Sequence, residues 1–140
     1  MSFVINLSGI DCERIKQIWS LPSAAKVLDM TPFGDFFVQV EDGIYLYSLT
    51  DGQINNVSDD VAEHGLPPVD IALGDEWYQL DAQIMLKEDG LSLAAQQCFG
   101  FKQPVFQDGD YGPDNIALME IYDYHQTVCD LLAKDKGYHQ

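Results

Sequence analysis

Alternating hydrophobic and polar positions in the first half of the chain predict an antiparallel sheet. Two Asp-Gly pairs separate three short runs rich in apolar residues, in the order 36–40, Asp42-Gly43, 44–49, Asp51-Gly52 and 53–57. Asp-Gly is a strong hairpin signal, because tight turns need the positive φ that Gly adopts without steric cost. In the middle run both sets of alternating positions are mostly apolar or aromatic. We therefore expect that strand to be covered on both faces.

Helical patterns lie on both sides of this predicted meander. Apolar residues recur at helical spacing in 8–20, behind Asp11 as N-cap, and in 69–88, which we interpret as one or two helices with a break at Gly74. Shorter elements are predicted as extended structure at 24–30, a helical turn at 59–64, extended structure at 98–101, a strand at 116–122 and a helix at 124–134. The predicted fold class is therefore α+β. An antiparallel meander over about residues 34–57 is flanked by helices, in a single compact domain of residues 1–140.

The net charge of the chain limits the classes of partner that it can bind. Of 140 residues, 46% are hydrophobic, which is enough to build a core, whereas 23 Asp and Glu face only seven Lys and Arg, a net charge of −16. Direct binding of nucleic acid needs a basic surface for the phosphates, and an anionic membrane repels such a chain. The composition therefore excludes both and favours a partner protein of opposite charge.

The acidic excess is concentrated in one window. Between Lys26 and Lys87 there is no Lys or Arg, and the same stretch holds twelve carboxylates. One interpretation is a solvated surface that keeps the protein soluble, and the other is an electronegative face for a cationic partner. Our candidate partner-binding residues lie beside breaker residues, where the chain must turn at the surface: Asp59, Asp60, Glu63, Asp75 and Glu76.

The cysteines and the N-terminal sequence favour a cytoplasmic protein. Cys12, Cys98 and Cys129 are odd in number and far apart, so we expect no disulfide and a reducing compartment. The first residues lack the basic and apolar regions of a signal peptide, and no apolar run is long enough to span a membrane.

Catalytic and metal-binding patterns are weak. His125 and Cys129 lie four residues apart on one helical face, but a core Cys beside a surface His explains this spacing better than a nucleophile pair. Asp108, Asp110 and Asp114 resemble the start of a calcium loop, yet Gly112 and Glu120 each miss the required loop position by one residue. We therefore expect no catalytic residues, no metal and no cofactor, and the protein is interpreted as a non-enzyme.

Two separated sequence blocks resemble a known family. They are TPFGDFF at 31–37 and CFGFKQP at 98–104, the second followed by GDYGPDN at 109–115. In this order they are similar to the Tdi-type immunity proteins of bacterial type VI secretion, within the wider Smi/Knr-like immunity group. The resemblance is to the C-terminal domain of the family that often follows a GAD-like domain. It covers about residues 28–135, and it departs from the family at Asp108, where the family has Gly.

The resemblance implies a cytoplasmic immunity protein that neutralises a cognate toxic effector by binding it. It assigns no catalytic residues, and it implies that the matched positions form the fold. Several family effectors are nucleases, and an acidic surface would fit the cationic groove of such an enzyme. Two alternatives stay open: a non-catalytic scaffold or regulatory module of the Smi/Knr-like group, and an uncharacterised enzyme using the 108–114 loop and His125. The sequence leaves the oligomeric state open.

Overall fold

The first half of the chain forms a four-stranded antiparallel sheet. The computed structural model describes residues 5–137. The strands pair in the order β1 (Lys26–Met30), β2 (Phe36–Val40), β3 (Gly43–Tyr47) and β4 (Ile54–Asn56). The predicted meander is therefore confirmed, and the extended segment predicted at 24–30 adds β1 as a fourth strand.

The two faces of the sheet carry separate apolar clusters. On one face Phe36 and Val38 pack toward α1 (Cys12–Ile18) and α5 (Ile121–Gly137). On the other face Phe37 packs against Trp77 and Tyr78 of the helical region that follows the sheet. The alternating residues of β3 are likewise divided between the two clusters, so the expected double coverage of that strand is confirmed.

Three helices follow the sheet: α2 (Ser58–His64), α3 (Ile71–Tyr78) and α4 (Leu80–Glu88). The predicted break at Gly74 is wrong, because Gly74 is buried within α3 and the chain bends at Gln79 instead. Gln79 has a left-handed backbone with φ 52°, and its side-chain amide donates to Thr50 Oγ1 at 3.1 Å. This tertiary hydrogen bond stabilises the bend at Gln79, whereas the sequence pattern predicted a break at Gly74.

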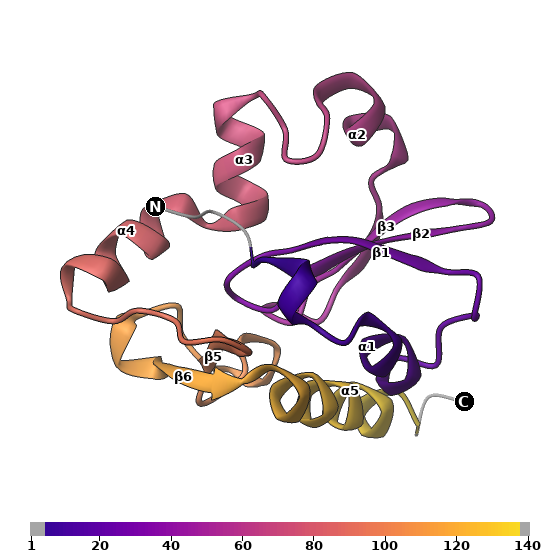
Figure 1. Cartoon of the computed structure of the whole chain (residues 1–140). Coiled ribbons are helices and arrows are strands. Elements are labelled where there is room, and N and C mark those ends of the chain that lie inside the picture. The colour runs from indigo at the N-terminus through magenta and orange to yellow at the C-terminus, as the bar shows by residue number, and fades with distance from the viewer. Residues whose placement is uncertain (1–4, 138–140) are drawn as a thin grey trace.

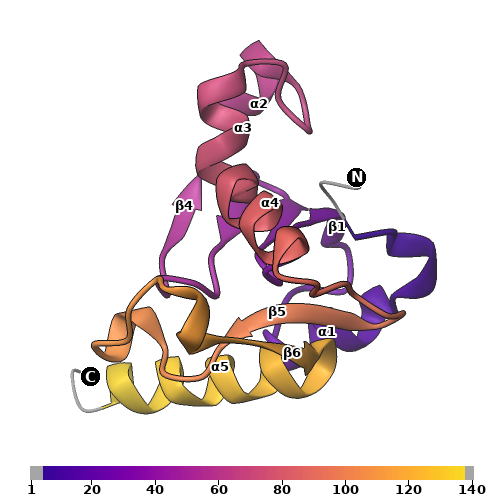
Figure 2. The ribbon, with the colours of Figure 1, turned by 90° about the vertical axis from the view of Figure 1, so that its left-hand side faces the viewer.

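The C-terminal part of the chain joins a small sheet to a long helix. β5 (Gln97–Phe101) pairs antiparallel with β6 (Ile116–Glu120), and α5 begins at once, three residues earlier than predicted. Glu120 explains the early start, because its Oε1 accepts from Tyr122 N at 2.6 Å and Asp123 N at 3.0 Å. Figure 2 shows β5 and β6 running along α5. Together with the meander they form a compact α+β domain.

A buried turn at residues 31–35 connects these parts. Its backbone closes through Thr31 N to Asp35 O at 2.7 Å, and Pro32 O accepts from Phe99 N of β5 at 2.7 Å. The Asp35 carboxylate is fully buried and accepts from Leu49 N at 2.7 Å and Thr50 N at 3.2 Å. The first sheet, the second sheet and the β3–β4 connection are therefore joined at one place.

A second buried polar group lies against this turn. Trp19 Nε1 of the α1 C-cap donates to His125 Nδ1 of α5 at 2.9 Å, and a Cβ added at Gly34 would lie 3.5 Å from His125 Nε2. Burial lowers the pKa of His125 to about 3, and burial raises the pKa of Asp35 to about 7. The histidine is neutral at physiological pH and holds α1 against α5.

We predict that Asp35 and His125 make opposite contributions to the pH dependence of stability. Asp35 has a raised pKa in the folded state, so its contribution is complete below its ordinary pKa of 3.8 and is lost as the pH rises through about 7. His125 has a lowered pKa, so its contribution is complete above 6.5 and is lost as the pH falls toward about 3. Between the ordinary pKa and the folded-state pKa of each group, the unfolding free energy changes by about 1.4 kcal/mol per pH unit. The change due to Asp35 has the opposite sign to the change due to His125.

Urea denaturation of three proteins from pH 4 to pH 7 tests this. The difference in unfolding free energy between Asp35→Asn and the wild type should rise with pH, because the Asn oxygen still accepts from Leu49 and Thr50 but does not ionise. For His125→Gln, which keeps an acceptor for Trp19, the deficit should shrink as the pH falls. A difference that stays constant with pH for either variant would contradict the prediction for that residue.

Candidate functional site

Helices α2 and α3 form an arm that projects from the sheet. We use "the arm" for residues 58–78, which comprise the two helices and their connection; Figures 1 and 2 show it at one end of the molecule, on the opposite side from α5. Its base is fixed to β3, where Ile44 O accepts from Val57 N at 2.8 Å and Ile44 N donates to Ser58 Oγ at 2.8 Å. The arm therefore begins at a defined position on the meander.

A buried hydrogen bond fixes the C-terminal end of the arm to the sheet. Tyr78, the last residue of α3, donates from its hydroxyl to Asp29 Oδ2 of β1 at 2.8 Å. Asp29 also accepts from Met30 N at 3.0 Å. Desolvation raises the pKa of Asp29, although both hydrogen bonds act in the opposite direction. The arm is thus held at both ends, and its outer surface has a fixed orientation.

All five sequence-predicted partner-binding residues lie on this arm. Asp59 and Asp60 occupy the first turn of α2, Glu63 lies near its end, and Asp75 and Glu76 lie in the last turn of α3. Four of them are exposed, whereas Asp75 is half-buried and accepts from Asp81 N at 3.2 Å. The structure brings the five carboxylates onto two consecutive helices.

The carboxylates of the 27–86 window fall into two groups. Half of them accept hydrogen bonds that support local structure: Asp29, Asp35, Asp42, Asp51, Asp70 and Asp75. Glu63 forms an ion pair with His64 at 3.7 Å. The side chains of Glu41, Asp59, Asp60, Glu76 and Asp81 form neither a hydrogen bond nor an ion pair among residues 5–134, whose side chains the structure describes. Asp29 and Asp35 are buried, so these two carboxylates cannot contribute to an electronegative face.

Two aliphatic residues at the tip of the arm were missed by the sequence reasoning. Val69 and Ile71 are 86% and 84% exposed, more than any other large hydrophobic residue in the part of the chain that the structure describes. The sequence contained a signal for them. They directly follow Pro67-Pro68 and precede the buried positions Gly74 and Trp77 of α3.

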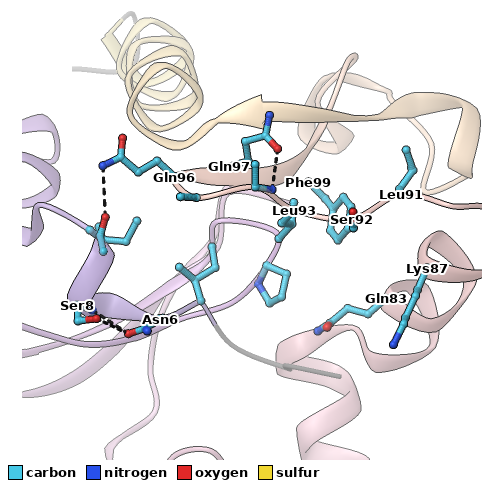
Figure 3. Close-up of a pocket in the computed structure, with 16 residues that line it drawn as sticks. Asn6, Ser8, Gln83, Lys87, Leu91, Ser92, Leu93, Gln96, Gln97 and Phe99 are labelled. Atoms are coloured by element: carbon cyan, nitrogen blue, oxygen red, sulfur yellow. Dashed lines mark hydrogen bonds between the residues drawn. The ribbon is translucent and has the colours of Figure 1, made fainter.

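A cleft lies elsewhere, beside α4. It has a volume of about 510 Å³ and is lined by the N-terminal segment, α4 and residues 91–97. Figure 3 shows Gln83 and Lys87 on one side and Asn6 and Ser8 on the other. Among the described lining residues Lys87 has the one ionisable side chain. The side-chain oxygen of Asn6 already accepts a hydrogen bond from Ser8 N at 3.0 Å. The cleft can take apolar groups but brings no acid–base pair together.

The expectation of a core Cys beside a surface His is wrong, because His125 is fully buried and Cys129 is only half-buried. Cys129 donates its thiol to Ile18 O at 3.3 Å, and His125 Nδ1 is occupied by Trp19, so they do not form a nucleophile–base pair. In the loop before β6, Asn115 accepts from Gln103 N and donates to Asp110 O, each at 2.8 Å. Among the side chains that the structure describes, those of residues 5–134, no three His, Cys, Asp or Glu are placed to hold a metal ion. The three cysteines are free thiols.

The chain matches none of the models of known protein families, and no curated protein is significantly similar to it. The resemblance to Tdi-type immunity proteins therefore stays a prediction. In the part of the chain that is described, no helix has the length and apolar character needed to cross a membrane.

We predict that Tyr78→Phe destabilises the protein by roughly 1–3 kcal/mol at pH 7, because the buried Asp29 carboxylate loses its donor. The loss should be smaller at acidic pH, since removal of the donor raises the pKa of Asp29 further and favours its neutral form. Urea denaturation at both pH values measures this.

Tyr47→Phe is the matched control. Its hydroxyl makes no hydrogen bond within the described residues, so it should change stability by less than about 0.5 kcal/mol. Equal losses for both variants would show that the Tyr78–Asp29 bond does not anchor the arm.

Proposed function

We propose that this protein is a cytoplasmic immunity protein that binds a toxic effector with a basic surface and thereby neutralises it. The exposed carboxylates of the arm make the contact with the effector. The observation that carries the proposal is the exposure of Asp59, Asp60 and Glu76, whose side chains have no hydrogen bond or ion pair among residues 5–134. Unneutralised carboxylates on a fixed element suit recognition of a cationic protein.

The charge of the chain supports the choice of partner. At −16 the protein repels phosphate, and between Lys26 and Lys87 it has no Lys or Arg to offset the acidic residues of the arm. A nuclease that grips DNA needs a cationic groove, so the most suitable effector is a nuclease. The two sequence blocks that resemble Tdi-type immunity proteins, 31–37 and 98–104, point to the same role.

The proposed mechanism is steric and electrostatic, with no covalent step. Opposite charge on the two surfaces speeds encounter over a short distance, because the screening length at physiological salt is about 8 Å. A firmly held arm then covers the basic surface of the effector and excludes its substrate.

Co-expression tests the proposal. Each protein encoded beside the gene of this chain is produced in bacterial cells with and without the chain, and growth is measured. One neighbour should stop growth alone and be tolerated together with this protein, and the two purified proteins should form a complex. If no neighbouring protein is toxic, or if the toxic one neither binds nor is neutralised, the proposal fails and a regulatory module becomes the better interpretation.

We predict that reversing Asp59, Asp60 and Glu63 to Lys slows association with this toxin by roughly tenfold or more at low salt. The salt dependence of the association rate should also become flatter, because fewer complementary charges steer the encounter. Stopped-flow or biosensor kinetics at several salt concentrations measure both quantities.

The control reverses Glu88, Asp89 and Asp114, which are exposed and lie outside the arm. Each triple variant changes the net charge of −16 by the same six units. An equal slowing by both variants would mean that overall charge acts rather than the arm, and an unchanged rate for the first variant would remove the acidic surface from the proposal.

A further inference from the structure

The tip of the arm exposes two neighbouring aliphatic side chains. Val69 and Ile71 are 86% and 84% exposed, whereas the next most exposed large hydrophobic residue, Tyr111, is 58% exposed and packs edge-on against Phe101. A single exposed hydrophobic residue is ordinary on a protein surface. Val69 and Ile71 are almost fully exposed and flank Asp70 in the sequence. We call these two aliphatic residues the apolar knob.

The fold does not need this knob. The arm packs on the sheet through other apolar residues of the same segment, which belong to the cluster around Phe37 and Leu46: Val61, Leu66, Leu73, Trp77 and Tyr78. Neither Val69 nor Ile71 belongs to any buried cluster. Because both side chains are exposed to water, they do not stabilise the isolated domain by packing.

The backbone nevertheless holds the knob in a defined position. Val69 N donates to His64 O at 2.9 Å, which closes the connection between the two helices. Asp70 caps α3 by accepting from Leu73 N at 2.9 Å, and its carbonyl accepts from Gly74 N at 2.9 Å. Both aliphatic side chains project from backbone that hydrogen bonds already fix, so little ordering remains for a binding event.

The charges beside the knob determine what can cover it. Asp70 lies between Val69 and Ile71, and the arm further carries Asp59, Asp60, Glu63 and Glu76 with no Lys or Arg. A second copy of the chain would bring an equal set of carboxylates to the same place, and an anionic membrane would be repelled. The complementary surface is an apolar socket on a protein, bordered by Lys or Arg.

We infer that Val69 and Ile71 are the apolar anchor by which the arm docks into such a socket on the toxic effector. This inference rests on the proposed function and names the contact that holds the complex together. The carboxylates steer association, while burial of the two aliphatic side chains slows dissociation. The two groups of residues therefore have separable kinetic effects.

The test measures binding of the neighbouring-gene toxin to Val69→Ser/Ile71→Ser. The dissociation constant should rise on the order of 10- to 100-fold through faster dissociation. The salt dependence of association should stay as in the wild type, and so should the melting temperature, because both side chains are exposed. Leu118→Ser/Ile84→Ser is the control: it also removes two partly exposed aliphatic residues, but from β6 and α4, and should leave binding unchanged.

Each outcome separates this inference from the proposed function. If the wild-type protein neither binds nor neutralises the toxin, the proposed function fails, and the inference fails with it. If the wild type binds but the double variant binds within twofold, the anchor is wrong while the proposed function stands. If sedimentation shows a wild-type dimer that the double variant dissociates, a second copy covers the knob and the inference is overturned. The milder Val69→Ala repeats the measurement if the double variant is unstable.

Discussion

The buried turn at residues 31–35 is the constraint on which the rest of the structure depends. All residues from Thr31 to Val38 are buried, so this stretch cannot satisfy its polar groups with water. Its carbonyls and the Asp35 carboxylate instead accept from the β3–β4 connection and from β5. Gly34, with φ +87°, lets the chain turn against Leu49 and His125, where a Cβ would be strained. The two sheets and α5 take their relative positions from this turn.

Under the proposed function, this arrangement separates the residues that stabilise the fold from those that recognise the partner. The turn, α1, α5 and the second sheet pack on one side of the meander, whereas the arm packs on the other through Phe37 and Trp77. The buried carboxylates Asp29 and Asp35 serve folding, whereas the side chains of Asp59, Asp60 and Glu76 on the arm make no hydrogen bond or ion pair among residues 5–134. A substitution on the outer side of the arm can therefore change binding without disturbing the core, which is what a partner-specific surface needs.

Local signals predicted most of the elements, and tertiary contacts account for what was missed. The Asp-Gly turns and the Asp11 cap are decided within a few residues, and the structure has both as expected. The bend at Gln79 depends on Thr50, and the burial of Asp29 depends on Tyr78, 49 residues away, so neither could be read from a local pattern. The five candidate residues lie together on the arm because they flank one breaker segment.

The positions of the arm carboxylates bear on whether solubility alone explains them. A negative charge is favourable at a helix N-terminus and unfavourable at a C-terminus. Asp59 and Asp60 lie in the first turn of α2, so helix stability accounts for them as well as recognition does. Glu76 lies in the last turn of α3, where it opposes the helix dipole, and it has no ion-pair partner in the described chain. Solubility would be served by a carboxylate at any exposed position. A carboxylate at an unfavourable position on the same arm as an exposed apolar knob is better explained by a partner that neutralises it on binding.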